Sequence, residues 1–429
     1  MGNEIPVQPS GKDRVLFPVL GLRVLHAATH RVAFAASLLD EPVSFERHRR
    51  ALYIRPVRVL VAPDKFKGTL SAPDAADAIV AGWRRARPGD EIGLVPLADG
   101  GEGTLDALVA EGGERRSAGV SGPHGAPLDA VFGLRYGSPP AGIVEMARAS
   151  GLALVPVGRR DPLRATSRGT GELMLAAVRA GARMLTVTLG GSATTDGGAG
   201  IAQALGIRLL DGRGREVGPG GVGLLDLERI DTSRLAPELR GVEVLALTDV
   251  DNPLVGPDGA AVVFGPQKGA TPDDVALLDR ALARFADMVR RDTGVDVASM
   301  PGAGAAGGVG ASLVAFLGAT LRSGIDAVME STGFRVRVKA ADVVLTGEGT
   351  FDAASLRGKV VGAVIRESWV AGAERVIVLC GRAEAPAPQG VQLVSLAERF
   401  GVERAMVSGR VLLEQLASEV ATEPGKVTT

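Results

Sequence analysis

Short runs of β-branched and aliphatic residues alternate with amphipathic stretches along most of the chain. The run at residues 57–62 is typical of a buried parallel strand, and the amphipathic stretch at 71–87 predicts a helix. Ser71 is a suitable N-cap for that helix. A second strand at 92–96 and a second helix at 104–111 repeat the order. This alternation predicts an α/β fold, in which helices cover a parallel sheet.

The same pattern returns near the carboxyl end of the chain. Further strands are predicted at 184–189, 242–247, 341–346 and 375–380, a further helix at 360–370, and a hairpin-like region at 119–145. No internal repeat and no long linker separates the two regular regions. We therefore expect a discontinuous domain, formed by residues 57–118 and 285–420, into which residues 119–284 are inserted as a second α/β domain.

Residues 1–56 do not share this pattern, because they hold three of the four His residues and few Gly residues. We expect them to form a poorly ordered N-terminal extension. An alternative hypothesis is that translation naturally starts at Val57, which would place the first strand at the N-terminus.

Composition excludes several classes of protein. The formal net charge is −1 and aromatic residues make up 3%, so the chain has neither the basic surface nor the stacking platforms of a nucleic-acid-binding protein. A single cysteine, Cys380, excludes an intrachain disulfide and a multi-cysteine metal site. No apolar run approaches the roughly 18 residues of a membrane span. We expect a cytoplasmic protein with neither a nucleic-acid nor a membrane partner.

Glycine and lysine are unevenly used. The chain has 59 Gly among 429 residues, but only seven of its 48 basic residues are Lys. The Gly residues and four of the Lys gather in loops that follow predicted strands, at residues 62–69, 97–104, 189–200, 248–253, 264–269, 301–308 and 345–359. Ligands of parallel sheets bind at this edge, and Gly-rich loops, Lys and carboxylates are typical of phosphate and Mg²⁺ binding. The loops therefore indicate phosphoryl transfer, which needs neither His nor Cys.

Each of these signals also has a structural interpretation. The Gly302–Gly307 segment fits a dinucleotide-binding pattern but follows Pro301 rather than a clear strand, so close helix packing or another kind of phosphate loop is favoured. Val360 after Lys359 excludes a Walker A motif. Acidic residues such as Asp64 could instead form caps or turns.

Taken together, the loops resemble the bacterial glycerate kinase family of the glycerate 2-kinase type. The matching motifs are residues 62–68, 98–104, 145–152, 166–173, 190–198, 252–254, 265–270, 304–308 and 346–349. The resemblance implies a flavodoxin-like domain that carries an inserted restriction-endonuclease-like domain, with the active site in the cleft between them. It implies phosphorylation of D-glycerate by ATP, with Mg²⁺, to 2-phosphoglycerate or 3-phosphoglycerate. The sequence departs from the family pattern at Arg168, Thr195, Thr350 and Ala354, which leaves substrate contacts at 350 and 354 in doubt.

The resemblance and the loop chemistry together give a set of candidate site residues. Asp196 is the candidate base or hydroxyl-orienting group. The further catalytic candidates are Lys67 and Asp64, and the candidates for binding substrate or nucleotide are Asp99, Glu102, Ser167, Gly191, Ser192, Asn252, Lys268, Gly307, Gly349 and Lys359. The candidate Mg²⁺ ligands are Asp249 and Glu348.

Three alternatives remain open at this stage. The chain could phosphorylate another small hydroxy acid, or it could be a catalytically silent relative that binds a nucleotide or hydroxy acid as a sensor. Assembly as a homodimer is also left open.

Overall fold

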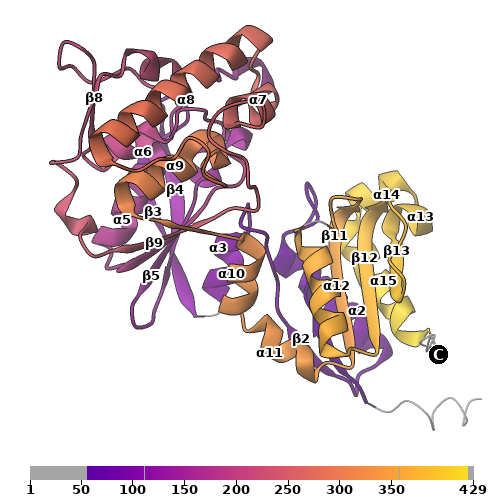
Figure 1. Cartoon of the computed structure of the whole chain (residues 1–429). Coiled ribbons are helices and arrows are strands. Elements are labelled where there is room, and N and C mark those ends of the chain that lie inside the picture. Colours follow the sequence, from indigo (N-terminus) through magenta and orange to yellow (C-terminus); the bar gives the residue numbers. More distant parts are fainter. Residues whose placement is uncertain (1–55, 111, 357, 424–429) are drawn as a thin grey trace, which may run out of the picture. The chain divides into compact units, whose positions relative to one another are not determined.

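Two main β-sheets organise the part of the chain that the structure describes. The structure is a computed structural model that describes residues 56–110, 112–356 and 358–423 (Figure 1). The five-stranded sheet consists of β1 (Arg58–Val61), β2 (Glu91–Leu94), β11 (Val343–Phe351), β12 (Arg375–Ala383) and β13 (Val391–Ser395). Its strand order is β13-β12-β11-β1-β2 and every neighbouring pair is parallel. The predicted parallel sheet is confirmed.

Helices cover both faces of the five-stranded sheet, because successive side chains of a strand point to opposite sides. Val59 and Val61 of β1 pack with α2 (Ala72–Ala86) and α15 (Gly409–Thr422) in one core cluster. Leu60, between them, packs with α12 (Val360–Ala371) in another (Figure 1). The smaller helices beside this sheet are α10 (Gly324–Ser331), α11 (Phe334–Arg337), α13 (Leu396–Phe400) and α14 (Val402–Val407).

The predicted helix at 71–87 corresponds to α2. The Ser71 hydroxyl accepts a hydrogen bond from the backbone N–H of Asp74, so Ser71 is the N-cap, as expected. At the other end, the indole N–H of Trp83 donates to Asp90 at 2.8 Å, which ties the helix to the turn before β2.

The six-stranded sheet is mixed. It consists of β3 (Gly113–Ser121), β4 (Pro127–Arg135), β5 (Ala141–Glu145), β6 (Met184–Thr188), β9 (Glu243–Leu247) and β10 (Thr320–Arg322). The order is β10-β9-β6-β5-β4-β3, in which β3, β4 and β5 are antiparallel and the other pairs are parallel. The predicted hairpin-like region is therefore an antiparallel meander, and the predicted strands at 184–189 and 242–247 are β6 and β9.

Helices and a two-stranded sheet pack around the six-stranded sheet. They are α4 (Ala147–Ser150), α5 (Arg168–Arg179), α6 (Ala199–Ala204), α7 (Ala260–Phe264), α8 (Pro272–Thr293) and α9 (Ala305–Leu317), with β7 (Arg208–Leu210) and β8 (Arg229–Asp231). Leu173 of α5 and Val309 of α9 share one buried core with Leu185 of β6. A second core lies between α6, α7 and α8 and includes Phe285.

The expected domain boundary at residues 284 and 285 falls inside α8. This helix contributes Leu278 on one side of the boundary and Phe285 on the other to the same core. The chain returns to the six-stranded sheet afterwards, because β10 pairs in parallel with β9. The sequence that builds this sheet therefore extends to Arg322, beyond the expected insert. A three-residue strand is too short to show a periodic pattern.

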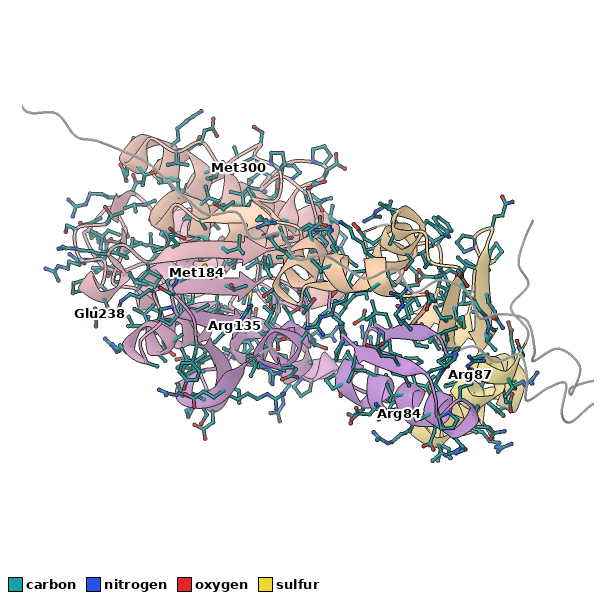
Figure 2. All side chains as sticks on the ribbon, turned by 90° about the horizontal axis from the view of Figure 1, so that it is seen from below. Arg84, Arg87, Arg135, Met184, Glu238 and Met300 are labelled. Carbon is teal, nitrogen blue, oxygen red and sulfur yellow. The ribbon has the colours of Figure 1, made fainter. Side chains whose placement is uncertain are left out.

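Two segments connect the sheets. The first is α3 (Thr104–Ala110), whose Leu105 N–H donates to the buried Glu145 carboxylate at the end of β5, at 2.8 Å. The second contains α10, where the Ser331 hydroxyl accepts a hydrogen bond from Arg135 at the end of β4. Arg135 is labelled in Figure 2. Both connections are thus fixed by polar contacts to the six-stranded sheet.

The predicted N-terminal extension, residues 1–56, lies outside the described residues apart from Pro56. Within the described residues, no helix is both long enough and apolar enough to cross a bilayer.

Candidate functional site

Four carboxylates from the ends of four strands are electrostatically linked. Asp64 follows β1, Asp99 follows β2, Glu348 lies in β11 and Asp249 follows β9. Asp99 raises the pKa of both Asp64 and Asp249, and Asp64 raises that of Glu348. We call these four residues the carboxylate cluster. It joins the carboxyl edge of the five-stranded sheet to that of the six-stranded sheet.

Asp64 is held in a nearly buried position, with 7% of its surface exposed. Its pKa is raised to about 6, because desolvation and the charge of Asp99 together outweigh the opposing effects of Lys65 and Lys359. The backbone N–H of Lys65 donates to Oδ1 at 2.7 Å, which orients the carboxylate. A carboxylate with a pKa near 6 is ionised at neutral pH yet basic enough to accept a proton.

Glu348 is the most strongly perturbed carboxylate of the cluster. Its pKa is raised to about 7, because burial and the charges of Asp64 and Asp352 together outweigh a hydrogen bond from Ser355 and the charge of Lys359. Its Oε1 atom is buried and, among the described residues, has no hydrogen-bond partner. An unpartnered buried oxygen is costly unless a ligand satisfies it.

We expect Glu348→Gln to stabilise the protein at alkaline pH. The ordinary pKa of 4.5 applies to the unfolded chain and about 7 to the folded one, so the folded state prefers the protonated form. The contribution of Glu348 to the free energy of unfolding is complete below pH 4.5 and is lost as the pH rises through 7. The variant should gain up to about 3 kcal/mol over the parent at pH 8, and little at pH 4.5. Urea unfolding at both pH values measures it, with the exposed Glu403→Gln as control. A gain of the same size at both pH values would contradict the assignment.

Three lysines lie in the loops of this edge. The Lys65 ammonium donates to the backbone carbonyl of Glu102 at 3.0 Å and lies 3.9 Å from Asp64. Lys359 is the N-cap residue of α12 and acts on the pKa of both Asp64 and Glu348. Lys67 is exposed, and its ammonium has neither a hydrogen bond nor an ion pair with any described residue. The edge therefore combines carboxylates with cations suited to phosphate.

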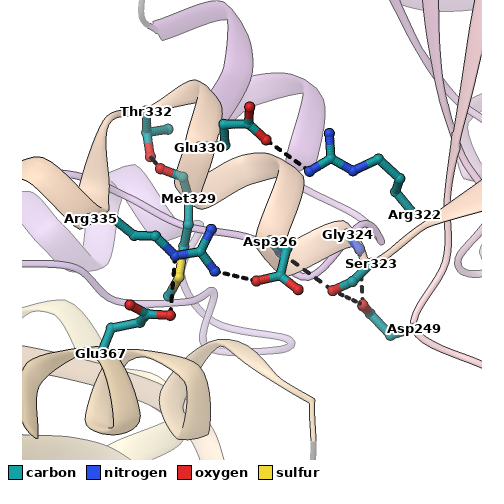
Figure 3. A network of polar contacts seen from close by, with 10 residues as sticks. All are labelled: Asp249, Arg322, Ser323, Gly324, Asp326, Met329, Glu330, Thr332, Arg335 and Glu367. Atoms are coloured by element: carbon teal, nitrogen blue, oxygen red, sulfur yellow. Dashed lines mark hydrogen bonds and ion pairs between the residues drawn. The ribbon is translucent and has the colours of Figure 1, made fainter. Parts of the chain in front are cut away.

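Asp249, which follows β9 of the six-stranded sheet, contacts the residues at the start of α10 (Figure 3). Its Oδ1 accepts hydrogen bonds from the Gly324 N–H at 2.9 Å and the Ser323 hydroxyl at 3.2 Å, at the start of α10. Although Asp249 is exposed to solvent overall, desolvation and Asp99 raise its pKa to about 6. Further along, Arg335 pairs with Asp326 of α10 and, at 3.1 Å, with Glu367 of α12. The strand-end acid is thus linked through α10 to the helix that follows Lys359.

The loop that carries Asp99 contacts both sheets through glycine. A Cβ atom on Gly190, after β6, would lie 2.7 Å from the Gly101 Cα atom. A Cβ atom on Gly100 would lie 2.9 Å from Gly324 Cα and 3.4 Å from Leu247 Cβ, at the end of β9. Backbones can approach this closely only where no side chain intervenes. The glycines here therefore bring the strand ends together.

Asp196, the candidate base, is enclosed by hydrogen-bond donors. Its carboxylate is fully buried and accepts hydrogen bonds from the Ser167 N–H and hydroxyl, both at 2.8 Å. The N–H groups of Gly198 and Gly200 donate to it as well. Burial raises its pKa and these hydrogen bonds lower it. A carboxylate enclosed in this way organises the loop before α6.

Lys268 belongs to the same buried network rather than to the strand-end loops. It is 2% exposed, and its ammonium donates to the backbone carbonyl of Thr194 at 2.5 Å. Burial lowers its pKa to about 7, against the charge of Asp196. Asp196, Lys268 and Ser167 are therefore grouped together, apart from the carboxylate cluster, and no hydrogen bond or ion pair among the described residues joins the two groups.

Gly307 was expected to cradle a nucleotide, but its surroundings explain it by packing. It is buried, with φ +73°, and a Cβ atom here would lie 2.0 Å from the Thr194 carbonyl oxygen. Its own carbonyl accepts a hydrogen bond from the Gly197 N–H at 2.9 Å. The first turn of α9 thus packs backbone against backbone, as the close-packing interpretation of the Gly302–Gly307 pattern expects.

We expect Gly307→Ala to destabilise the fold by about 2–4 kcal/mol, since it adds both backbone strain and a steric clash. The matched control is Gly294→Ala, which shares a positive φ of +80° but has open space around its Cα and should cost about 1 kcal/mol. Urea unfolding measures both. Equal losses in the two variants would show that the clash with Thr194 is absent.

The other expected binding residues are divided between the two sheets. Glu102 is exposed and its side chain lies near Gly191, where a Cβ atom would be 3.6 Å from Glu102 Oε1. Ser192 forms an isolated antiparallel β-bridge with Gly151. Gly349 lies against the Phe66–Lys67 backbone, next to the carboxylate cluster. The Asn252 amide donates to the Asp258 carbonyl at 2.8 Å, which gives it a loop-forming contact.

Sequence reasoning omitted Lys65 and Ser355 from the site. Lys65 contacts Asp64 and Glu102, and Ser355 acts on Glu348. Lys65 lies in the 62–69 loop beside the candidate Asp64. The available signal was that Lys is rare in this chain and gathers in such loops. Ser355 carried none, because its link to Glu348 depends on a turn at Asp352.

The cluster can be tested for its fit to a divalent cation. Within the described ranges, no group of three or more His, Cys, Asp or Glu is arranged as a complete metal site. Mg²⁺ usually takes one or two carboxylates, with phosphate oxygens and water as the other ligands. The unpartnered Glu348 oxygen and the nearby Asp64 are oxygen donors of this kind, so these residues fit the ion together with a phosphate-bearing substrate.

Comparisons with known proteins identify relatives of this chain. The model of the glycerate kinase family matches residues 59–423. Glycerate kinase of Halalkalibacterium halodurans is 45% identical over 370 residues, which cover 85% of this chain and 97% of the relative. Glycerate 2-kinase of Escherichia coli K12 is 47% identical over 305 residues, covering 71% and 80%. A crystal structure of a protein described as glycerate kinase 2 from Salmonella typhimurium LT2 matches with TM-score 0.76 and 41% identity, covering 86% and 98%.

Proposed function

The chain belongs to the glycerate kinase family, and on this premise we propose that it transfers the γ-phosphoryl group of ATP to D-glycerate at the carboxylate cluster. The observation that supports this site best is the set of raised pKa values there, about 6 for Asp64 and Asp249 and about 7 for Glu348. Perturbed carboxylates beside cations at strand ends are typical of catalytic sites.

In the proposed reaction, a glycerate hydroxyl oxygen attacks the γ-phosphorus as the bond to the ADP oxygen breaks. Asp64 replaces Asp196 as the group that orients this hydroxyl and accepts its proton, because its pKa of about 6 suits a base at neutral pH. Lys67 and Lys359 bind the phosphates or the glycerate carboxylate. Lys65 holds the Asp64 loop against Glu102.

Glu348 would hold Mg²⁺ together with the phosphates, which leaves Asp64 to act as the base. The ion, when bound, neutralises charge on the phosphate oxygens in the transition state. Cation binding also relieves the cost of burying the unpartnered Glu348 oxygen.

We also propose how the described chain is divided into domains. The order of the five-stranded sheet, read along the chain as 2-1-3-4-5, is the flavodoxin-like order. We therefore divide the described chain into a flavodoxin-like domain and an inserted α/β domain that runs from β3 to β10, about residues 113–322. Assembly as a homodimer and a cytoplasmic location stay predictions.

One assay tests the function. ADP release is followed with D-glycerate, L-glycerate, tartronate and hydroxypyruvate as acceptors, and NMR of the product identifies the phosphorylated hydroxyl. We expect D-glycerate to give the highest kcat/KM, with phosphate on the 2-hydroxyl. A higher value for another acceptor would reassign the substrate, and ADP release with none of them would favour a sensor.

A further inference from the structure

A large cavity lies in the six-stranded part of the protein, away from the carboxylate cluster. Its volume is about 1370 Å³, and it is lined by the turn between β3 and β4, by residues of the 154–168 segment, and by residues around β7. None of Asp64, Asp99, Asp249 and Glu348 lines it. The proposed reaction therefore leaves this cavity without a role.

The cavity is strongly cationic in a chain whose net charge is −1. Five arginines line it, Arg159, Arg164, Arg168, Arg208 and Arg234, against two carboxylates, Asp161 and Glu216, which leaves a formal charge of +3 with His124 neutral. Both carboxylates are already engaged. Asp161 accepts from the Leu163 N–H at 3.1 Å, and Glu216 pairs with Arg208 at 3.1 Å. Asp161 also pairs with Arg164, and Glu172, outside the lining, pairs with Arg168, so the positive charge left for an anionic ligand is that of Arg159 and Arg234.

Two of these arginines are available for a ligand. Arg159 and Arg234 are both exposed, and within the described ranges neither guanidinium has a hydrogen bond or an ion pair. Their backbones are nevertheless fixed. Arg159 ends a 3₁₀ turn with its N–H bonded to Pro156, and a Cβ atom on Gly206 would lie 2.3 Å from the Arg234 carbonyl oxygen. Fixed arginines without partners are suited to bidentate binding of phosphate.

The remaining wall is apolar. Leu128, Leu154, Val155, Val217 and Pro219 line the cavity between the arginines. Its volume exceeds the 300–1,000 Å³ or so of typical small-molecule pockets, so it has room for more than a bare phosphate or a three-carbon acid. Guanidinium groups also stack on aromatic rings. The lining therefore suits a ligand with phosphate at one end and a ring system at the other.

We propose that this cavity is a second small-molecule site, which binds a nucleotide through Arg159 and Arg234 and is separate from the site of phosphoryl transfer. The cavity also touches the buried network. Thr166 lines it, and the next residue, Ser167, holds Asp196 through its N–H and hydroxyl. A ligand in this cavity would stabilise the folded protein, because it would bind the folded state and not the unfolded chain.

AMP is the probe, because it carries phosphate and a base but has no γ-phosphoryl group to transfer. Isothermal titration of the full chain measures its Kd. The test variant is Arg159→Ala with Arg234→Ala, and the matched control is Arg213→Ala with Arg229→Ala, two arginines that do not line the cavity. A third variant, Lys67→Met, removes a lysine of the proposed catalytic site and so shows whether AMP binds there instead of in the cavity. Binding is measured directly, so the result does not depend on whether glycerate is the acceptor.

We expect the test variant to raise the Kd of AMP at least tenfold, while the control pair and Lys67→Met leave it within twofold. We also expect kcat and the KM values for ATP and glycerate, measured without AMP, to be unchanged in the test variant. The proposal is overturned if AMP does not bind or binds the test variant normally. It is equally overturned if Lys67→Met abolishes binding, or if the test variant raises the KM for ATP or glycerate, since the cavity would then belong to the catalytic site.

Discussion

Asp64→Asn should lower kcat by about 10²–10⁴-fold while leaving the folded protein at least as stable as the parent. The activity falls because the amide cannot accept the hydroxyl proton. Stability is retained because the amide oxygen can still accept the Lys65 N–H, and because burial penalises the carboxylate it replaces, whose pKa is about 6. Coupled ADP release measures kcat, and urea unfolding at pH 8 measures stability.

The matched control is Asp287→Asn on α8, where the carboxylate only pairs with Arg290 at the surface. Its kcat and stability should both remain near those of the parent. Turnover by Asp64→Asn within a few-fold of the parent would remove Asp64 from the catalytic residues. A large loss of stability would instead show that its carboxylate is structural.

Asp196→Ala should destabilise the fold by about 3–5 kcal/mol, the cost of breaking a buried and fully hydrogen-bonded charge. Its removal leaves four donors without an acceptor, from Ser167, Gly198 and Gly200, and leaves Lys268 without the charge that favours its ammonium form. Urea unfolding measures the loss, with Asp287→Ala as control.

This result separates the two interpretations of Asp196. A catalytic base would be expendable for folding, so its alanine variant would unfold like the parent but turn over far more slowly. A structural anion gives the opposite pattern. Its loss lowers the unfolding midpoint, and activity falls in proportion to the fraction that is folded. Unchanged stability with collapsed turnover would restore Asp196 as the base.

Local patterns were sufficient to predict four of the five strands of the five-stranded sheet, β1, β2, β11 and β12, but not β13. The alternation at 57–62 and the amphipathic stretch at 71–87 are properties of neighbouring residues, and they became β1 and α2 with Ser71 as the cap. The extent of the second sheet could not be predicted in this way. Strand β10 has three residues and is defined by its partner β9, which lies more than seventy residues away along the chain.

The site residues show the same division. Asp64, Asp99 and Glu348 could be placed together because they follow or end strands of one parallel sheet. Asp196 stands in an equally suggestive loop, but its burial depends on Ser167 and on the first turn of α9, contacts that no local pattern shows. The cationic cavity was also invisible in the sequence, since its arginines come from separate segments.

Asp64 raises the pKa of Glu348, so a proton bound at Asp64 changes the proton affinity of Glu348, and the reverse holds as well. Interacting carboxylates of this kind release their protons in macroscopic steps that belong to the pair and not to single residues. The acidic limb of a rate profile should therefore be broad, and its midpoint will not identify the base.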